Sequence, residues 1–114
     1  MSTENGTLPF EERVGRARAV LPEGLPAAGP GLLVALDIDG TLLSHDQTLT
    51  DTVREAVAAL HASGAELILS TGRSVQSVVP VAHELGLTQG WAVCSNGAVC
   101  IRLDPDAEGG REIT

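Results

Sequence analysis

The stretch LLVALDIDGTL, residues 32–42, determines the fold class expected for this chain of 114 residues. Its first five residues form an apolar run of strand length that ends abruptly at Asp37, as expected for a strand buried on both faces. Side chains alternate along an extended chain, so Asp37 and Asp39 are expected to project to the same side. Two carboxylates so close together repel each other unless a cation offsets the repulsion. Mg²⁺ is the cation that fits best, because it selects hard oxygen ligands.

An ordinary turn is the alternative interpretation of this stretch, because Asp and Gly are common turn residues. A turn accounts for Asp39 and Gly40, but it does not account for an acid at Asp37, inside the apolar boundary. It also leaves unexplained the hydroxyl-bearing loop, Ser70 and Thr71, at the end of the next strand.

Strand and helix patterns alternate from residue 32 onward, which predicts an α/β fold with a parallel sheet and helical crossovers. Pro80 is expected to kink or split the second helix. The expected elements are a strand at 32–36, a helix from the cap Thr50 to the stop at Gly64, a strand at 66–69, a helix at 74–85, a strand at 91–94, and a hairpin of 98–103 with 111–114.

Residues 1–31 are expected to form an extension and a Pro/Gly-rich linker around one short helix at 11–20. The apolar positions of that helix have helical spacing, but a loosely held tail is the preferred interpretation. Residues 32–114 form the predicted domain.

Charge and composition exclude several classes of protein. The chain has 15 acidic residues against 7 basic ones, and none of the basic ones is Lys. A net charge of −8 argues against binding to nucleic acid or to an anionic membrane. The polar N-terminal residues lack a secretory pattern, and no apolar run is long enough to span a membrane, so a cytoplasmic location is expected. Cys94 and Cys100 are expected to be reduced and buried.

Three loops follow the three predicted parallel strands, and the carboxyl ends of such strands are where open sheets bind ligands. These loops are DIDGTL at 37–42, STGR at 70–73 and SNGA at 95–98. Together they resemble the haloacid dehalogenase (HAD) superfamily of phosphohydrolases, and in particular its Cof-type sugar-phosphate phosphatases. The resemblance extends from residue 32 to residue 114, and it implies a three-layer, Rossmann-like HAD core.

The resemblance implies a covalent mechanism with two aspartates. Asp37 would be the nucleophile that forms an aspartyl-phosphate, and Asp39 would be the general acid and base. Mg²⁺ would bind to Asp37 and to the main-chain carbonyl of Asp39. The substrate would be a small phosphorylated metabolite, expected to be a sugar phosphate.

The phosphoryl group would be bound by the loops. The resemblance assigns its contacts to the hydroxyl of Thr71 and to backbone N–H groups near Gly40, Thr41 and Gly72. Arg73 and Asn96 are further candidates for orienting substrate or loops. Each has a structural alternative: Arg73 could pair with an acid such as Glu66 or Glu84, and Asn96 with Gly97 could be a simple turn.

Two features of the family are missing from this sequence. Family members also carry a basic residue, normally Lys, and a later acidic signature that completes the Mg²⁺ site. Their cap domain would begin where this chain ends. The chain is therefore interpreted as the amino-terminal part of a phosphatase, with its cap absent and with poor activity alone.

Two other functions remain open: a catalytically inactive remnant that acts as a binding or regulatory module, and a phospho-acceptor domain. A phospho-acceptor would usually need a Lys and would not require the DGTL residues at 39–42. The sequence does not predict the oligomeric state.

Overall fold

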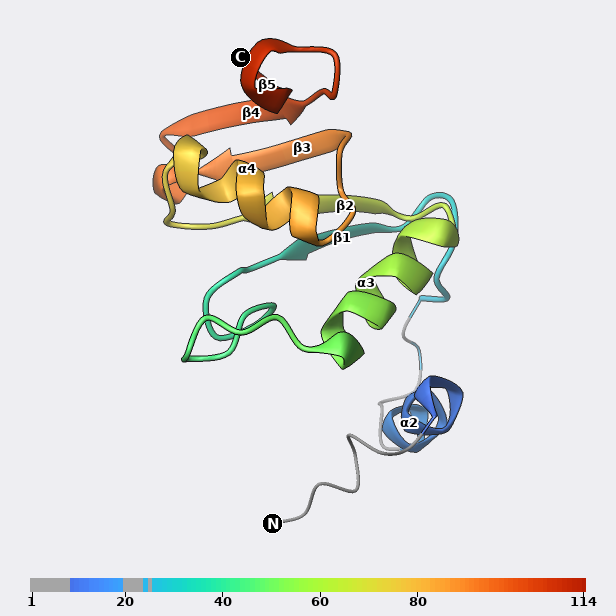
Figure 1. The fold of residues 1–114 in the computed structure, drawn as a ribbon. Coiled ribbons are helices and arrows are strands. Elements are labelled where there is room, and N and C mark those ends of the chain that lie inside the picture. Colours follow the sequence, from blue (N-terminus) through green and yellow to red (C-terminus); the bar gives the residue numbers. More distant parts are fainter. Residues whose placement is uncertain (1–8, 20–23, 25) are drawn as a thin grey trace.

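The computed structural model describes residues 9–19, 24 and 26–114. Figure 1 shows a single sheet with helices packed against it and an N-terminal helix below. The helices are α2 (Phe10–Arg18), α3 (Asp51–Ala62) and α4 (Val75–Glu84), and the strands are β1 (Leu33–Leu36), β2 (Glu66–Ser70), β3 (Gly90–Cys94), β4 (Val99–Leu103) and β5 (Arg111–Ile113). Two short 3-10 turns, Ser95–Gly97 and Glu108–Gly110, precede β4 and β5.

The sheet has five strands in the order β1-β2-β3-β4-β5. β1, β2 and β3 are parallel, with Leu36 opposite Leu69 and Ser70 opposite Val93. β4 and β5 continue the sheet in antiparallel fashion. The predicted parallel sheet and the predicted hairpin are both confirmed.

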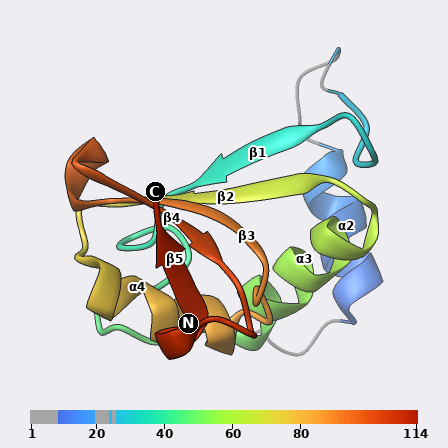
Figure 2. The ribbon, with the colours of Figure 1, turned by 90° about the horizontal axis from the view of Figure 1, so that it is seen from above.

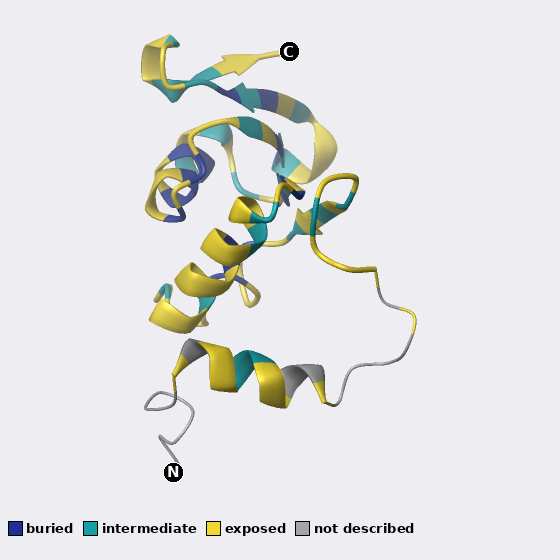
Figure 3. Ribbon diagram, turned by 90° about the vertical axis from the view of Figure 1, so that its right-hand side faces the viewer, coloured by how far each residue is buried: buried dark blue, intermediate teal, exposed yellow. Residues whose placement is uncertain are grey.

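The helices α3 and α4 cover one face of the sheet (Figure 2). The core lies between that face and the helices, where Leu69, Ala92 and Ile101 meet Val78 and Ala82 of α4. Figure 3 shows buried residues on the inner sides of the helices and exposed ones outside. The described residues thus form two layers of a Rossmann-like core.

The opposite face of the sheet is open in the described part of the chain. Leu33 of β1 is 59% exposed and Trp91 of β3 is 41% exposed. The expectation that the first strand is buried on both faces is therefore wrong. Exposed and half-buried residues alternate along β1, because it has only β2 beside it and helices on only one of its faces.

The ends of α3 and α4 follow their sequence signals. The Thr50 hydroxyl caps α3 by accepting a hydrogen bond from the Val53 N–H at 3.2 Å. Gly64 and Gly86 follow the two helices with φ of +94° and +78°, which glycine adopts without steric cost. The expected split at Pro80 does not occur, since α4 runs unbroken through it. Burial of four residues on both sides of Pro80 stabilises the helix there: Val78, Val79, Val81 and Ala82.

The N-terminal helix is attached more firmly than a loosely held tail. Arg13 of α2 forms an ion pair with Glu55 of α3 at 2.8 Å and donates a hydrogen bond to the hydroxyl of Thr52. Its side chain is only 14% exposed. The predicted helix at 11–20 is observed as α2, and its predicted last residue, Val20, lies outside the described residues.

The two cysteines differ in their surroundings. Both are free thiols, as expected, but only Cys94 is buried, and burial raises the pKa of its thiol. The expected burial of Cys100 is wrong, because its side chain projects from β4 on the open face. In the described ranges, we find no helix that is long and apolar enough to cross a membrane.

Candidate active site

Three loops meet at the carboxyl edge of the parallel strands. The loop after β1 begins at Asp37, the loop after β2 at Thr71, and the loop after β3 at Ser95. Main-chain hydrogen bonds join the second and third loops: the Ser95 N–H donates to the Arg73 carbonyl at 2.8 Å, and the Asn96 N–H to the Thr71 carbonyl at 3.1 Å. The sequence-predicted site residues therefore share one edge of the sheet.

The first loop is a tight turn around the carbonyl of Ile38. This oxygen accepts hydrogen bonds from the N–H groups of Thr41, Leu42 and Leu43, and the Ile38 side chain is fully buried. Asp37 and Asp39 lie on either side of Ile38, and both are exposed. Burial of the residue between them directs both aspartates toward solvent, as the alternation of side chains predicted.

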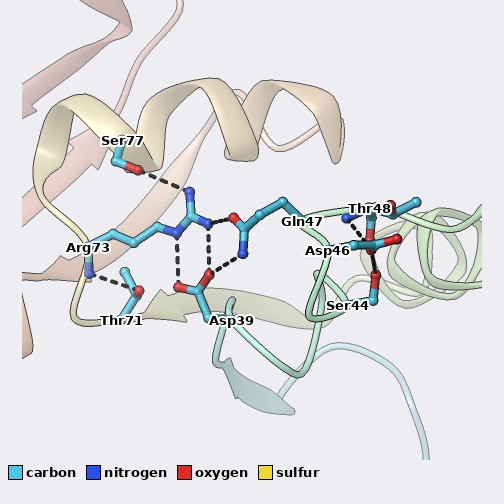
Figure 4. A network of polar contacts seen from close by, with 8 residues as sticks. All are labelled: Asp39, Ser44, Asp46, Gln47, Thr48, Thr71, Arg73 and Ser77. Atoms are coloured by element: carbon cyan, nitrogen blue, oxygen red, sulfur yellow. Dashed lines mark hydrogen bonds and ion pairs between the residues drawn. The ribbon is translucent and has the colours of Figure 1, made fainter.

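The two carboxylates have different surroundings. Asp39 accepts two hydrogen bonds from Arg73 in a fork, from Nε to Oδ2 at 2.9 Å and from Nη2 to Oδ1 at 2.7 Å (Figure 4). The carboxylate of Asp37 has no hydrogen bond or ion pair with any described residue. One aspartate is held by a cation, whereas the other is free to react or to bind a ligand.

The observed partner of Arg73 differs from both acids that the sequence suggested. Glu66 lies at the other end of β2, and Glu84 lies at the far end of α4, so neither is near the guanidinium. The loop after β1 supplies the partner instead, because β1 and β2 are parallel neighbours and their loops leave the same edge. Arg73 Nη1 also donates to the Ser77 hydroxyl at 3.0 Å.

This pairing changes the acidity of Asp39. The hydrogen bonds from Arg73, and after them the one from Gln47, lower the pKa of the Asp39 carboxyl from 3.8 to about 2. The same contact raises the pKa of Arg73. In this arrangement Asp39 is an ionised carboxylate, which accepts a proton more readily than it donates one.

Gln47 is a site residue that the sequence reasoning did not identify. Its amide Nε2 donates to Asp39 Oδ1 at 3.2 Å, and its Oε1 accepts from Arg73 Nη2. Its backbone is left-handed, with a φ of +68°. The one available signal was its place in a polar loop shortly after the first motif, which is a weak signal.

Thr71 is placed to donate a hydrogen bond. It is the buried polar residue of the core, only 6% exposed, and its hydroxyl oxygen accepts from the Arg73 N–H at 3.1 Å. Its hydroxyl proton has no acceptor in the described part of the chain. A hydroxyl so oriented can donate to an anion at the edge of the sheet.

The backbone N–H groups near the first two loops differ in availability. Those of Gly40 and Thr41 donate to the carbonyls of Leu43 and Ile38, at 2.8 and 3.2 Å. The N–H of Gly72 has no partner among the described residues. Of the three groups predicted to bind a phosphoryl group, only that of Gly72 is free.

Asn96 occupies a strained turn beside Gly72. Ser95 and Asn96 have φ of +51° and +55°, an uncommon conformation for residues other than glycine. A Cβ atom added to Gly72 would lie 3.0 Å from Asn96 Oδ1. The Asn96 side chain thus packs on the second loop, which favours a role in positioning that loop.

The oxygen ligands at this edge suit Mg²⁺ in kind but are few. No group of three or more His, Cys, Asp or Glu side chains in the described ranges is arranged to bind a metal ion. The free carboxylate of Asp37 is a suitable ligand, since Mg²⁺ prefers carboxylate and carbonyl oxygens and keeps several waters. Asp39 offers its main-chain carbonyl while its carboxylate is engaged by Arg73.

Residues 34–111 match the haloacid dehalogenase-like hydrolase family, and the chain belongs to this family. The match covers the three loops described above, β1 from its second residue onward, all of β2, β3 and β4, and the first residue of β5. The resemblance of the three motifs is thereby confirmed.

Individual relatives agree with this family. The chain is 40% identical over 83 residues to a protein of Streptococcus pyogenes serotype M6, covering 71% of this chain and 29% of that one. It is 40% identical over 65 residues to the pyridoxal phosphate phosphatase YbhA of Escherichia coli, covering 57% of this chain and 24% of that enzyme.

A solved sugar phosphatase of HAD subclass IIB has a similar structure, with a TM-score of 0.53 and 29% identity. The similarity covers 60% of this chain and 27% of that one. The chain therefore spans only 24–29% of the length of these relatives.

Proposed function

We propose that this protein takes part in the hydrolysis of small phosphate monoesters, with Asp37 as the nucleophile. The single observation that carries the proposal is the contrast between the two aspartates at the carboxyl edge of the sheet. Asp37 is exposed and unpartnered in the described structure, whereas Asp39 is ionised and held by Arg73. Nucleophilic catalysis needs such a free carboxylate beside a separate group for proton transfer.

The first half of the reaction would form an aspartyl-phosphate. A carboxylate oxygen of Asp37 forms a bond to phosphorus, and the bond from phosphorus to the ester oxygen breaks. The leaving alcohol takes its proton from Asp39. Because Asp39 is ionised beside Arg73, it must leave the guanidinium or gain a proton on substrate binding before it can act as an acid.

The second half would return the free enzyme. Water attacks phosphorus, Asp39 accepts a proton from that water, and the bond between phosphorus and Asp37 breaks to release inorganic phosphate. The ionised state of Asp39 in the structure suits this half of the reaction, since a carboxylate with a pKa near 2 remains a proton acceptor at neutral pH.

The Thr71 hydroxyl and the Gly72 N–H would donate hydrogen bonds to the phosphoryl oxygens. Mg²⁺, when bound to the Asp37 carboxylate and the Asp39 carbonyl, would supply positive charge that offsets the repulsion between phosphate and carboxylate. The family and the sugar phosphatase of similar fold support both the cofactor and a sugar phosphate as substrate.

A trapping experiment tests the nucleophile directly. The chain is incubated with Mg²⁺ and para-nitrophenyl phosphate or a sugar phosphate, and borohydride is added to reduce any acyl phosphate to the alcohol. Mass spectrometry should find homoserine at position 37 and nowhere else. Asp106→Asn, in the exposed turn before β5, is a matched control that should leave the product unchanged. Homoserine at another acid, or equal trapping in Asp37→Asn, would refute the assignment.

Slow turnover would not by itself count against the proposal. The chain contains no Lys, and positive charge near the phosphoryl group supplies much of the catalysis in phosphoryl transfer. We therefore expect slow release of phosphate. We also expect weak Mg²⁺ binding, in the millimolar range, because the Asp37 carboxylate and one carbonyl are the ligands assigned to it. Tight, micromolar binding in titration calorimetry would mean that the chain supplies further ligands.

A further inference from the structure

We propose that Gln47 is a positioning residue that holds the Asp39 carboxylate and the Arg73 guanidinium in one fixed arrangement. The term positioning rests on the proposed function, in which Asp39 transfers the proton. The arrangement itself is seen in the hydrogen bonds among these side chains and does not depend on that function. We call the group formed by Asp39, Gln47, Arg73 and Ser77 the Arg73 cluster (Figure 4).

The Gln47 amide fits between its two partners in only one orientation. Its NH₂ donates to the carboxylate, and its oxygen accepts from the guanidinium. A carboxylate cannot donate and a guanidinium cannot accept, so a flipped amide would lose both bonds. The amide also adds no charge to a site that already has two aspartates.

The backbone of Gln47 is in the left-handed conformation. Its φ of +68° is one that Gly and Asn adopt more readily than Gln. A residue chosen only to make this turn would be Gly or Asn. Backbone strain of this kind clusters at functional sites, so the left-handed φ of Gln47 points to a role for its side chain.

Hydrogen bonds within the turn hold the Gln47 backbone in place. The Gln47 N–H donates to the Ser44 carbonyl at 2.8 Å, and the Ser44 N–H donates to the Thr48 carbonyl at 3.0 Å. The carboxylate of Asp46 accepts from the Thr48 N–H at 3.2 Å and from the Ser44 hydroxyl. These four residues close a small loop at whose end Gln47 faces Asp39.

The Arg73 guanidinium donates hydrogen bonds to three different side chains. Asp39 accepts from Nε and Nη2, Ser77 from Nη1, and Gln47 from Nη2. The Arg73 side chain is 20% exposed, against 50% for Asp39. Asp39 is the more exposed partner, and Gln47 is the only residue besides Arg73 that donates to its side chain in the described structure.

Four variants separate a role of the side chain from a role of the turn. Gln47→Leu removes both hydrogen bonds. Gln47→Gly removes them as well but relieves the left-handed backbone, and Gln47→Asn suits the backbone but is one carbon too short to reach both partners. Gln76→Leu is the control, because Gln76 is exposed on α4 and forms no side-chain hydrogen bond in the described part of the chain.

The measurement is the rate at which the Arg73 Nε–H proton exchanges with water, by NMR of the ¹⁵N-labelled chain. The signal is assigned as the one that Arg73→Lys removes. We expect exchange to become at least about threefold faster in the three Gln47 variants and to stay unchanged in Gln76→Leu. The midpoint of denaturant unfolding should not fall in Gln47→Gly, because glycine accepts the turn.

The combination of faster exchange with undiminished stability is the expected result, and a merely structural role would not produce it. Unchanged exchange in both Gln47→Leu and Gln47→Gly would overturn the proposal, as would recovery of the original rate in Gln47→Asn. None of these measurements depends on turnover, so homoserine found at an acid other than Asp37 would refute the proposed function and leave this inference standing.

Discussion

Arg73 and Arg102 both bind carboxylates, and the surroundings of these two arginines are very different. Arg73 lies between two loops at the carboxyl edge of the sheet and is held in a fork by one aspartate. Arg102 lies on the open face of β4, pairs with Glu112 of the neighbouring strand, and lies 3.4 Å from Asp104. The Arg73 side chain is 20% exposed and that of Arg102 is 41% exposed.

The difference between these two pairs lies in what each of them joins. Arg102 and Glu112 face each other across two antiparallel strands that are joined by a hairpin, so their contact is local. Arg73 and Asp39 are 34 residues apart, and their contact joins loops from two different strands. Exposed pairs contribute little to stability, so we expect function to depend on the first pair and almost nothing to depend on the second.

Asp37→Asn should produce the largest effect at the edge that holds the Arg73 cluster. An amide cannot attack phosphorus, so phosphate release should fall by at least about a thousandfold, or to background. The unfolding midpoint should change little, because Asp37 has no partner in the described structure. Phosphate release is measured under single-turnover conditions with the chain in excess. Arg102→Gln should remain within about twofold of the original rate, and an equal loss in both variants would break the comparison.

Arg73→Gln should raise the pKa of the Asp39 carboxyl. The folded pKa of Asp39, about 2, lies below its ordinary value of 3.8, so the cluster stabilises the fold above pH 3.8. That contribution is lost as the pH falls from about 4 toward 2. In Arg73→Gln the Asp39 titration should move up toward 3.8, as followed by NMR of the carboxyl carbon without added metal. A midpoint that stays near 2 would show that another group holds the carboxylate.

Gly72→Ala should disturb the contact between the second and third loops. The new Cβ would lie 3.0 Å from Asn96 Oδ1, in a turn whose backbone is already strained. We expect a loss of about 1–2 kcal/mol in the free energy of unfolding, measured by urea denaturation. Gly15→Ala, in α2 with open space around the added Cβ, should instead be neutral or stabilising. Equal stability of both variants would mean that Asn96 moves aside freely.

Arg102→Gln should have the smallest effect. Its partner Glu112 is exposed on the hairpin, and Asp104 keeps the hydrogen bond from the Asp106 N–H when Arg102 is replaced. The midpoint of thermal unfolding should be indistinguishable from that of the original chain at physiological salt. A clear fall in the unfolding midpoint would show that the Arg102–Glu112 pair stabilises the protein, and the two arginine pairs would then not differ in the expected way.

The elements of the fold could be predicted from local signals. The apolar run before Asp37, the cap at Thr50 and the stops at Gly64 and Gly86 each act through neighbouring residues, and the structure bears them out. Exposure could not be predicted in the same way. The open face at Leu33 and Cys100 depends on which elements pack there, which no local pattern in β1 or β4 encodes.

The sequence predicted which loops form the candidate site, but it did not predict the side-chain contacts within it. Three motifs at the ends of parallel strands brought Asp37, Thr71 and Asn96 to one edge. The partner of Arg73 was missed because a side chain of this length can reach several acids, and register decides among them. Gln47 was missed because its role comes from a left-handed turn, and a single polar residue in a loop gives no sign of such a turn. The boundary between residues 31 and 32 remains a prediction.

The position of β1 at the end of the sheet has a consequence for local unfolding. Among the residues that the structure describes, β1 has one neighbouring strand, so its main-chain amides should exchange with deuterium sooner than those of β3, which has two. The strand that leads to Asp37 is thus an edge strand, like β5 at the other end of the sheet, and frays more readily than the strands between them. The fork between Asp39 and Arg73 ties the far end of this strand to β2, in the manner of a crosslink that limits the freedom of a chain end. Protection of the amides near Leu36 should therefore fall when Arg73 is replaced, while protection in β3 stays the same.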